Sequence, residues 1–242
     1  MSSTTYHVLV QAREGSTRLP TKVLSLVGKE TLIEGVISRF HSQKCTVLSG
    51  IESNNRSLQE VVFRLGYQIK FGDDLNVFKR YADFAKTSDH EYLVRVTGDN
   101  PFVVYDCIGD MIDLMESKKL DYCINCDIPI GCALEIIRRT SLLELESSGV
   151  DKYTQEHVTP AFYKESSPWR WAKYSCGFSN LEKLRLTVDT IEDLQLVNNL
   201  CEYFNRCCRD ISLHEISRLY SLNPEFFQIN QKISQRSFRD LE

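Results

Sequence analysis

The segment that decides the fold is Tyr6-His-Val-Leu-Val-Gln-Ala-Arg-Glu-Gly-Ser-Thr-Arg-Leu-Pro-Thr-Lys22. Its first part, Tyr6 to Gln11, is a short apolar run that predicts a buried strand. The remainder is a polar loop that contains Gly15 and Pro20. Glycine lets the backbone approach a ligand closely, and hydroxyl and amide groups can cradle anionic oxygens. We therefore expect the chain to open with a strand whose following loop faces a ligand.

Downstream of this loop, segments with helical apolar spacing alternate with short strand-like runs. Helices are predicted at 31–43, 57–65, 75–86 and 107–118, and strands at 46–51, 68–71, 91–96 and 122–126. Thr31 is the expected N-cap of the first helix, and Ser57 with Glu60 has the pattern of a capping box. This alternation predicts a doubly wound α/β sheet, mostly parallel and flanked by helices.

The second half of the chain is less regular. Strands are predicted at 133–138, 171–175 and 186–188, and helices at 141–147, 154–165, 190–204 and 213–222, with Thr190 capping the third of these helices. No Pro/Gly/Ser-rich linker and no internal repeat divides the sequence. We therefore expect residues 1–242 to form a single domain.

The composition narrows the class of protein. The chain is 42% hydrophobic and 26% charged, as in globular proteins, and its formal charge of −4 argues against a nucleic-acid partner. No apolar run reaches the length of a membrane span, and the N-terminus lacks a signal peptide's apolar region, so we expect a cytoplasmic protein. Nine cysteines at irregular spacings, among them Cys123-x-x-Cys126, predict reduced structural thiols rather than disulfides or zinc.

Three loops carry candidate site residues at the carboxyl ends of predicted strands, where α/β sheets bind ligands. The first loop places Arg13, Arg18 and Lys22 within ten residues. Arginine suits bidentate contact with phosphate, and lysine supplies a mobile charge. A solvated basic loop is the other interpretation. The Gly-Lys-Ser/Thr ending of a Walker loop is absent, so a phosphate site here would be of another kind.

The other two segments each supply an aspartate. Asp99 follows the predicted strand 91–96, and Asp189 precedes the helix that Thr190 caps. A carboxylate beside phosphates needs a cation between them, which points to Mg²⁺ held partly by substrate oxygens. The alternatives are structural: Asp99 can bond the amides of its own turn, and Asp189 can favour the positive end of the helix.

Taken together, these segments resemble a known family, the CMP-sugar synthetases, which include the CMP-Kdo and CMP-acylneuraminate synthetases. The resemblance is closest to the SpsF-type branch of spore-coat polysaccharide synthesis. It is carried by Ala12-Arg13-x-x-Ser16-Thr17-Arg18-Leu19-Pro20-x-Lys22, Val94-Arg95-Val96-Thr97-Gly98-Asp99-x-Pro101, Glu156-His157-Val158-Thr159-Pro160 and Leu186-Thr187-Val188-Asp189-Thr190-x-Glu192-Asp193-Leu194. Thr21 stands where the family often has glycine, and Glu14 where an apolar residue is usual.

The resemblance implies a glycosyltransferase-A-like nucleotidyltransferase fold and a CTP-dependent cytidylyltransferase. Such an enzyme joins CMP to a sugar acid, such as a Kdo-like or nonulosonic 2-keto sugar, and releases pyrophosphate during surface polysaccharide synthesis. A glycosyltransferase of the same fold is the alternative. Homodimerisation is also implied, and we expect the interface within residues 128–174, where Trp169 and Trp171 either meet a partner or belong to the core.

The resemblance also assigns roles by position. Arg13, Lys22 and Asp99 would be catalytic, and Asp99 with Asp189 would bind Mg²⁺. The nucleotide would contact Ala12, Arg13, Ser16, Arg18, Lys22 and Gly98. Contacts to the acceptor are expected from Gly131, Glu135 and His157, in a region that matches the family loosely because Cys132 and Ala133 are unusual there.

Overall fold

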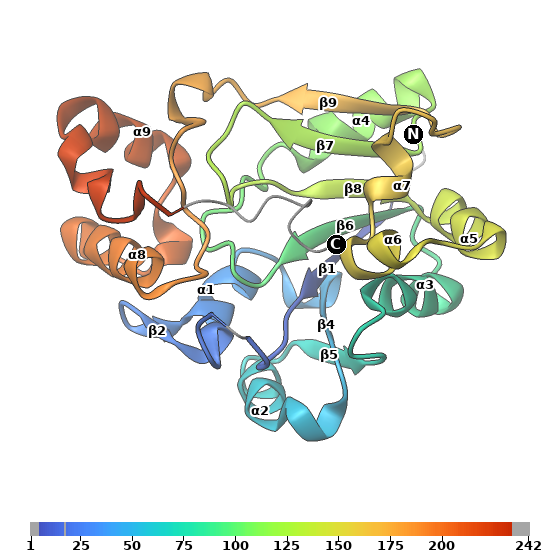
Figure 1. Cartoon of the computed structure of the whole chain (residues 1–242), viewed down its shortest axis with the longest axis horizontal. Helices are drawn as coiled ribbons and strands as arrows, with labels where there is room; N and C mark the ends of the chain where they lie inside the picture. The colour runs from blue at the N-terminus through green and yellow to red at the C-terminus, as the bar shows by residue number, and fades with distance from the viewer. Residues whose placement is uncertain (1–4, 17, 234–242) are drawn as a thin grey trace.

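A seven-stranded mixed sheet forms the centre of the molecule (Figure 1). The computed structural model describes residues 5–16 and 18–233, so Thr17 of the first loop lies outside it. In spatial order the strands are β5 (Gln68–Phe71), β4 (Cys45–Ser49), β1 (Tyr6–Gln11), β6 (Tyr92–Thr97), β8 (Glu135–Arg138), β7 (Tyr122–Cys126) and β9 (Trp171–Ser175).

Strand direction determines which loops meet. β1 is parallel to β4 and β6, β5 is parallel to β4, and β9 is parallel to β7, whereas β8 is antiparallel to both of its neighbours. Gln11 at the end of β1 pairs with Thr97 at the end of β6. The loops that follow these two residues therefore leave the same edge of the sheet, side by side. The predicted mostly parallel sheet is confirmed, and the antiparallel β8 makes it a mixed one.

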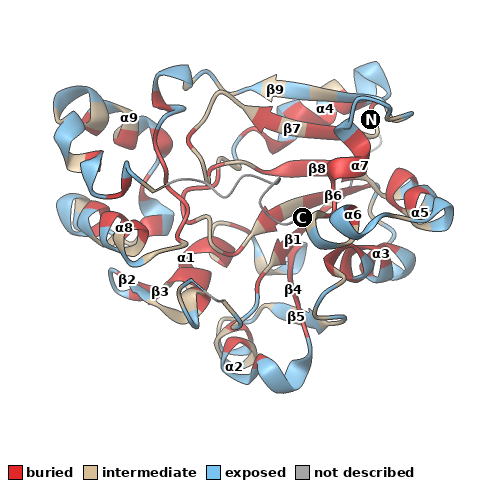
Figure 2. Cartoon of the chain, viewed as in Figure 1, coloured by how far each residue is buried: buried red, intermediate tan, exposed pale blue. Residues whose placement is uncertain are grey.

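Helices cover both faces of the sheet. The described helices are α1 (Leu32–Ile37), α2 (Arg56–Arg64), α3 (Val77–Thr87), α4 (Ile108–Lys118), α5 (Arg139–Ser148), α6 (Lys152–His157), α7 (Pro160–Tyr163), α8 (Ile191–Phe204) and α9 (Leu213–Leu222). Side chains alternate along β1: Val8 and Val10 pack with α1, α2 and α4, whereas Leu9 packs with α3 and α5. Figure 2 shows the resulting pattern: the central strands are buried, the edge strands β5 and β9 are partly exposed, and the outer faces of the helices are exposed.

A third apolar cluster lies beside the sheet. α8, α9 and Val27 contribute to it, and Val27 belongs to a short hairpin of β2 (Leu26–Val27) and β3 (Glu30–Thr31). Capping fixes where its long helix begins. The Thr190 hydroxyl accepts from the Asp193 amide, and the Asp193 carboxylate accepts from the Thr190 amide in return. This capping box confirms the predicted N-cap of α8.

Three sequence predictions need correction. Residues 186–188 form no strand; Arg185 makes one isolated bridge with Ile130, and the segment then crosses the carboxyl edge of the sheet. The Ser57–Glu60 capping box is wrong as well, because α2 begins at Arg56. The predicted helix 154–165 is split into α6 and α7, since Val158 takes a left-handed backbone (φ 72°) before Pro160 starts the second helix.

The structure also shows the state of the cysteines and the lengths of the helices. All nine cysteines are free thiols; Cys123 and Cys132 are buried, and Cys126 is half-buried. Burial raises the pKa of the Cys123 thiol to about 12, so it stays protonated at neutral pH. Among the described helices, none combines the length and apolar character needed to cross a bilayer.

Candidate active site

A cleft of about 910 Å³ opens at the carboxyl ends of β1 and β6. Its walls come from five segments that are far apart in the sequence: the loop after β1, the loop between β5 and α3, the turn after β6, α6, and the residues before α8. The close approach of the first and third segments depends on Gly98. A Cβ at Gly98 would lie 2.9 Å from the Ala12 Cβ and 3.2 Å from the Gln11 carbonyl oxygen.

The loop after β1 is tied to α2 through Glu14. The Glu14 carboxylate accepts a hydrogen bond from the Leu58 amide at 2.8 Å, and the Glu14 amide donates to Asn55 Oδ1 at 2.9 Å. Glu14 thus caps α2 from outside the helix, which explains why the local Ser57–Glu60 box does not form. Farther along, Thr21 adopts φ 52°, a left-handed conformation that favours glycine.

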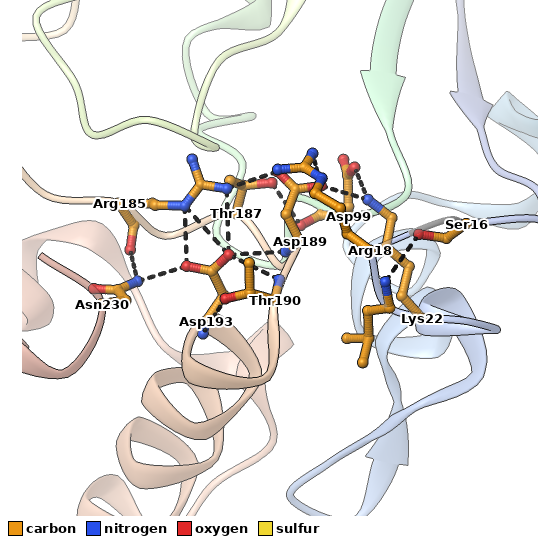
Figure 3. Close-up of polar contacts among 11 residues, drawn as sticks. Ser16, Arg18, Lys22, Asp99, Arg185, Thr187, Asp189, Thr190, Asp193 and Asn230 are labelled. Atoms are coloured by element: carbon orange, nitrogen blue, oxygen red, sulfur yellow. Dashed lines mark hydrogen bonds and ion pairs between the residues drawn. The ribbon is translucent and has the colours of Figure 1, made fainter. Parts of the chain in front are cut away.

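Two cations of this loop meet the two predicted metal ligands (Figure 3). Lys22 Nζ lies 2.6 Å from Asp99 Oδ2 and 2.8 Å from Asp189 Oδ1, and Arg18 Nη2 lies 2.9 Å from the same Asp189 oxygen. The Lys22 side chain is 14% exposed. Burial by itself would lower the pKa of Lys22, but the carboxylates of Asp99 and Asp189 raise it above its usual value. The ammonium therefore stays charged at neutral pH.

The third cation lies elsewhere in the cleft. Arg13 is exposed, and its Nη1 donates to the Asp74 carbonyl oxygen at 3.5 Å, near the start of α3. Ser16 lines the cleft between Arg13 and the Arg18–Lys22 pair along the chain, and its hydroxyl accepts from the Leu19 amide. The three predicted cations are thus spread along one wall of the cleft rather than gathered at one point.

Asp189 forms hydrogen bonds with Arg185 and Asp193, two residues that the sequence did not assign to the site (Figure 3). Arg185 Nη2 donates to Asp189 Oδ2 at 2.7 Å, and Arg185 Nε donates to Asp193 at 3.0 Å. Asp193 is fully buried and also accepts from the Asp189 amide and from Asn230 Nδ2, at 3.0 and 2.8 Å. Burial would raise the pKa of Asp189, but Lys22, Arg18 and Arg185 lower it, so Asp189 stays ionised.

The oxygen atoms around this point suit a hard divalent cation. Asp99 Oδ1 is buried and has no hydrogen-bond partner among the described residues, an arrangement that is costly unless a cation or donor joins it. Within residues 5–16 and 18–233, no group of three or more His, Cys, Asp or Glu side chains gathers to form a complete metal site. Asp99 and Asp189 can therefore supply part of a Mg²⁺ coordination shell, and substrate and water oxygens would complete it.

A further residue that the sequence did not assign to the site is Arg80, on the first turns of α3. It lines the cleft and is only 4% exposed, yet its Nε and Nη1 atoms have no hydrogen-bond partner among the described residues. Its Nη2 donates to the Asp74 carbonyl oxygen at 3.3 Å. The apolar pattern of this helix did not indicate that Arg80 is buried, because an arginine beside an apolar helix face normally extends to solvent.

The three predicted acceptor contacts occupy different places. His157 lines the cleft at the end of α6, and its pKa is lowered, chiefly by burial. Gly131 has φ 90°, and a Cβ there would lie 2.3 Å from the Thr187 amide, so this glycine allows the 184–188 segment to pass. Glu135 is buried behind the cleft wall, where it pairs with Arg95 and accepts from the Tyr122 and Thr159 hydroxyls at 2.5 and 2.6 Å.

The fold, the cationic wall and the paired aspartates define a nucleotidyltransferase. More particularly, the chain belongs to the cytidylyltransferase family, whose model matches residues 7–233. It is 26% identical over 235 residues to the spore coat polysaccharide biosynthesis protein SpsF of Bacillus subtilis, covering 90% of this chain and 94% of SpsF.

Solved structures agree with this assignment. A cytidylyltransferase from Leptospira borgpetersenii superimposes with a TM-score of 0.85 at 28% identity, covering 96% of this chain and 99% of that one. A CMP:2-keto-3-deoxy-manno-octonic acid synthetase, solved in complex with CTP, shares the fold with a TM-score of 0.62 at 13% identity, over 83% of this chain and 99% of that one.

Proposed function

We propose that this cytidylyltransferase joins CMP from CTP to a hydroxyl of a sugar acid, of the 2-keto-3-deoxy type, and releases pyrophosphate. The observation that carries the proposal is the convergence of Lys22 and Arg18 on Asp99 and Asp189 at the cleft. The similarity to SpsF supports a place in surface polysaccharide synthesis, in the cytoplasm where CTP is made.

The cleft offers separate surfaces for the parts of the nucleotide. Arg80 has two donors, Nε and Nη1, without a partner among the described residues, and they suit the base and ribose. Arg13 lies beside the loop before α3, where it contacts the Asp74 carbonyl oxygen. Ala12, Ser16 and Gly98 line the floor, where backbone and hydroxyl groups can bond phosphate oxygens. Arg18 and Lys22 then face the leaving pyrophosphate. We assign the acceptor to the part of the cleft that His157 lines.

The reaction is chiefly one of positioning and charge neutralisation. The acceptor oxygen forms a bond to the α-phosphorus, the bond from that phosphorus to the bridging oxygen breaks, and the hydroxyl proton is released. Arg18 and Lys22 exchange their carboxylate partners for phosphate oxygens and stabilise the charge on pyrophosphate. Mg²⁺ held by Asp99 and Asp189 would neutralise phosphate charge and lower the pKa of the attacking hydroxyl. Arg185 favours the ionised form of Asp189 throughout, and Asp193 holds the Asp189 backbone in place by accepting from its amide.

A coupled pyrophosphate assay tests the proposal. Purified enzyme with Mg²⁺ and CTP is given 3-deoxy-manno-octulosonate, N-acetylneuraminate and neutral hexoses in turn, and products are identified by mass spectrometry. We expect pyrophosphate and a CMP-sugar with at least one sugar acid, and much less product with UTP or ATP. Transfer of sugar from a nucleotide sugar without pyrophosphate release would instead establish a glycosyltransferase.

We also propose that the chain, acting as a single domain, forms a homodimer through residues 128–174. Two observations support this region. β9 is the last strand of the sheet order, and Trp171 on it is 37% exposed, whereas Trp169 packs on Phe162 with ring centroids 5.4 Å apart. Light scattering on the wild type and on Trp171→Lys tests the proposal, with a dimer expected for the former and a monomer for the latter.

A further inference from the structure

A buried polar cluster lies on the sheet face below the acceptor wall. Its centre is Glu135, which is 7% exposed and pairs through Oε2 with Arg95 Nη1. Its other oxygen, Oε1, accepts from Tyr122 and Thr159. Both carboxylate oxygens are therefore committed to protein donors. Such a residue is poorly placed to contact an acceptor directly, so any effect of Glu135 on the reaction has to pass through a neighbour.

The neighbour is Gln11, and Arg95 links it to Glu135. Arg95 Nη2 donates to Gln11 Oε1 at 3.3 Å, and Gln11 lines the cleft at the end of β1. Arginine has only donors, so the Gln11 atom that meets it is the amide oxygen and not the nitrogen. The Gln11 NH₂ group must then point away from Arg95. Among the described residues, no acceptor takes these two N–H donors.

The contact also sets the direction of the side chain. Arg95 lies on β6, and Glu135 pairs opposite it on β8. Gln11 is thus drawn toward β6 and β8 and away from β4. Thr159, two residues after His157, contacts Glu135 on β8, so this is also the direction in which the segment after α6 lies. Its partner in the strand register, Thr97, lines the same part of the cleft.

We propose that Gln11 is a specificity-determining residue that donates a hydrogen bond to an oxygen of the acceptor sugar, and that Arg95 and Glu135 are its positioning residues. This rests on the function proposed above. A neutral donor suits a hydroxyl or carboxylate oxygen of the acceptor and adds no charge that would compete with the phosphate-binding cations. Glu135 therefore influences the acceptor without touching it.

The test compares acceptor and nucleotide kinetics in matched variants. Gln11→Met removes the donor at similar volume, and Gln11→Glu keeps the Arg95 contact but replaces the NH₂ group by an oxygen. Gln68→Met, exposed on β5, is the control for the same chemical change. With the sugar acid that the wild type uses best, we expect kcat/KM for the acceptor to fall about tenfold or more in both Gln11 variants. The Kd of Mg²⁺–CTP, measured by calorimetry, should stay within about twofold.

The positioning role is tested by a mutant cycle. Arg95→Met combined with Glu135→Gln removes both charges of the buried pair, so neither is left unpaired. We expect this variant to lose acceptor kcat/KM to the same extent as Gln11→Met, and the triple variant to lose no more than either. Additive losses would overturn the positioning role, since they would mean that Arg95 and Glu135 act independently of Gln11.

Two further outcomes are decisive. Unchanged acceptor kinetics in Gln11→Met, or a loss of CTP affinity equal to the loss of acceptor kcat/KM, would overturn the assignment of Gln11 to the acceptor. In either case the wild type still makes the CMP-sugar, so the proposed function stands. Absence of pyrophosphate release by the wild type with every sugar acid, despite CTP binding, would overturn the proposed function and this inference together.

Discussion

Lys22 occupies the position between Asp99 and Asp189 that a bound metal ion would need, so its removal should expose a metal site. We predict that Lys22→Met binds a divalent cation in the absence of nucleotide much more tightly than the wild type does. In the wild type, a cation entering between these carboxylates must displace an ammonium that makes contacts of 2.6 and 2.8 Å and is only 14% exposed.

The expected size follows from those two contacts. A hydrogen bond between charged groups contributes about 1.5–3 kcal/mol net, so breaking both opposes metal binding by at least ~3 kcal/mol. This corresponds to roughly a 100-fold difference in Kd. Without metal, Lys22→Met leaves two carboxylates less well paired, and the same ~3 kcal/mol is lost from stability, or roughly 6–12 °C in Tm for a chain of this length.

Mn²⁺ is the probe, because free Mn²⁺ is counted directly by electron paramagnetic resonance. Lys22→Met should bind Mn²⁺ about 100-fold more tightly than the wild type and recover its lost Tm when Mn²⁺ is added. Lys22→Arg, which keeps the charge, should bind as weakly as the wild type, and Lys29→Met at an exposed position should change nothing. Equal Mn²⁺ affinity in the wild type and Lys22→Met would refute the reasoning.

Four further predictions follow from the site and its supports. Asp99→Asn should abolish pyrophosphate release while circular dichroism stays near wild type and Tm falls only by the roughly 3–6 °C that one lost Lys22 contact implies. Normal turnover would remove Asp99 from the metal site. Arg80→Met should weaken Mg²⁺–CTP binding by calorimetry about tenfold or more without lowering stability, because its Nε and Nη1 atoms have no hydrogen-bond partner among the described residues. Glu14→Ala removes the external cap of α2 and should cost about 1 kcal/mol in urea unfolding; no change would show that the capping contact is unimportant. Burial, with smaller effects of His90 and Lys70, lowers the pKa of His7 from 6.5 to about 4. Between these two pH values the unfolded chain binds more protons than the folded one, so stability should fall as the pH drops from 7 to 5. In His7→Gln this fall in stability should be smaller by about 1–2 kcal/mol.

Elements whose stability depends on local patterns were predicted well. The strand Tyr6–Gln11, the helix Leu213–Leu222 and the N-cap at Thr190 match the structure, because apolar periodicity and capping act within a few residues. The errors have non-local causes. α2 is capped by Glu14, which lies 44 positions from Leu58, and residues 186–188 leave the strand conformation to pack across the edge of the sheet.

The candidate site divides in the same way. The sequence by itself determined the chemistry available: cations at 13, 18 and 22, aspartates at 99 and 189, and the order of motifs that indicates the family. The tertiary structure decided which of these groups meet. Lys22 and Arg18 contact Asp189 across more than 160 positions, whereas Arg13 lies apart beside Asp74.

Burial was likewise a property of the fold alone. Arg80, Arg185 and Asp193 look like ordinary surface or capping residues in the sequence, yet the packing of α3 and α8 against the cleft removes them from water. A charged group taken out of water must find a partner or a ligand, and which one it finds depends on chain segments that no local pattern brings together. Glu135 shows the same physics: its residue type suggested a direct contact with the sugar, but burial against Arg95, Tyr122 and Thr159 makes any effect on the cleft an indirect one.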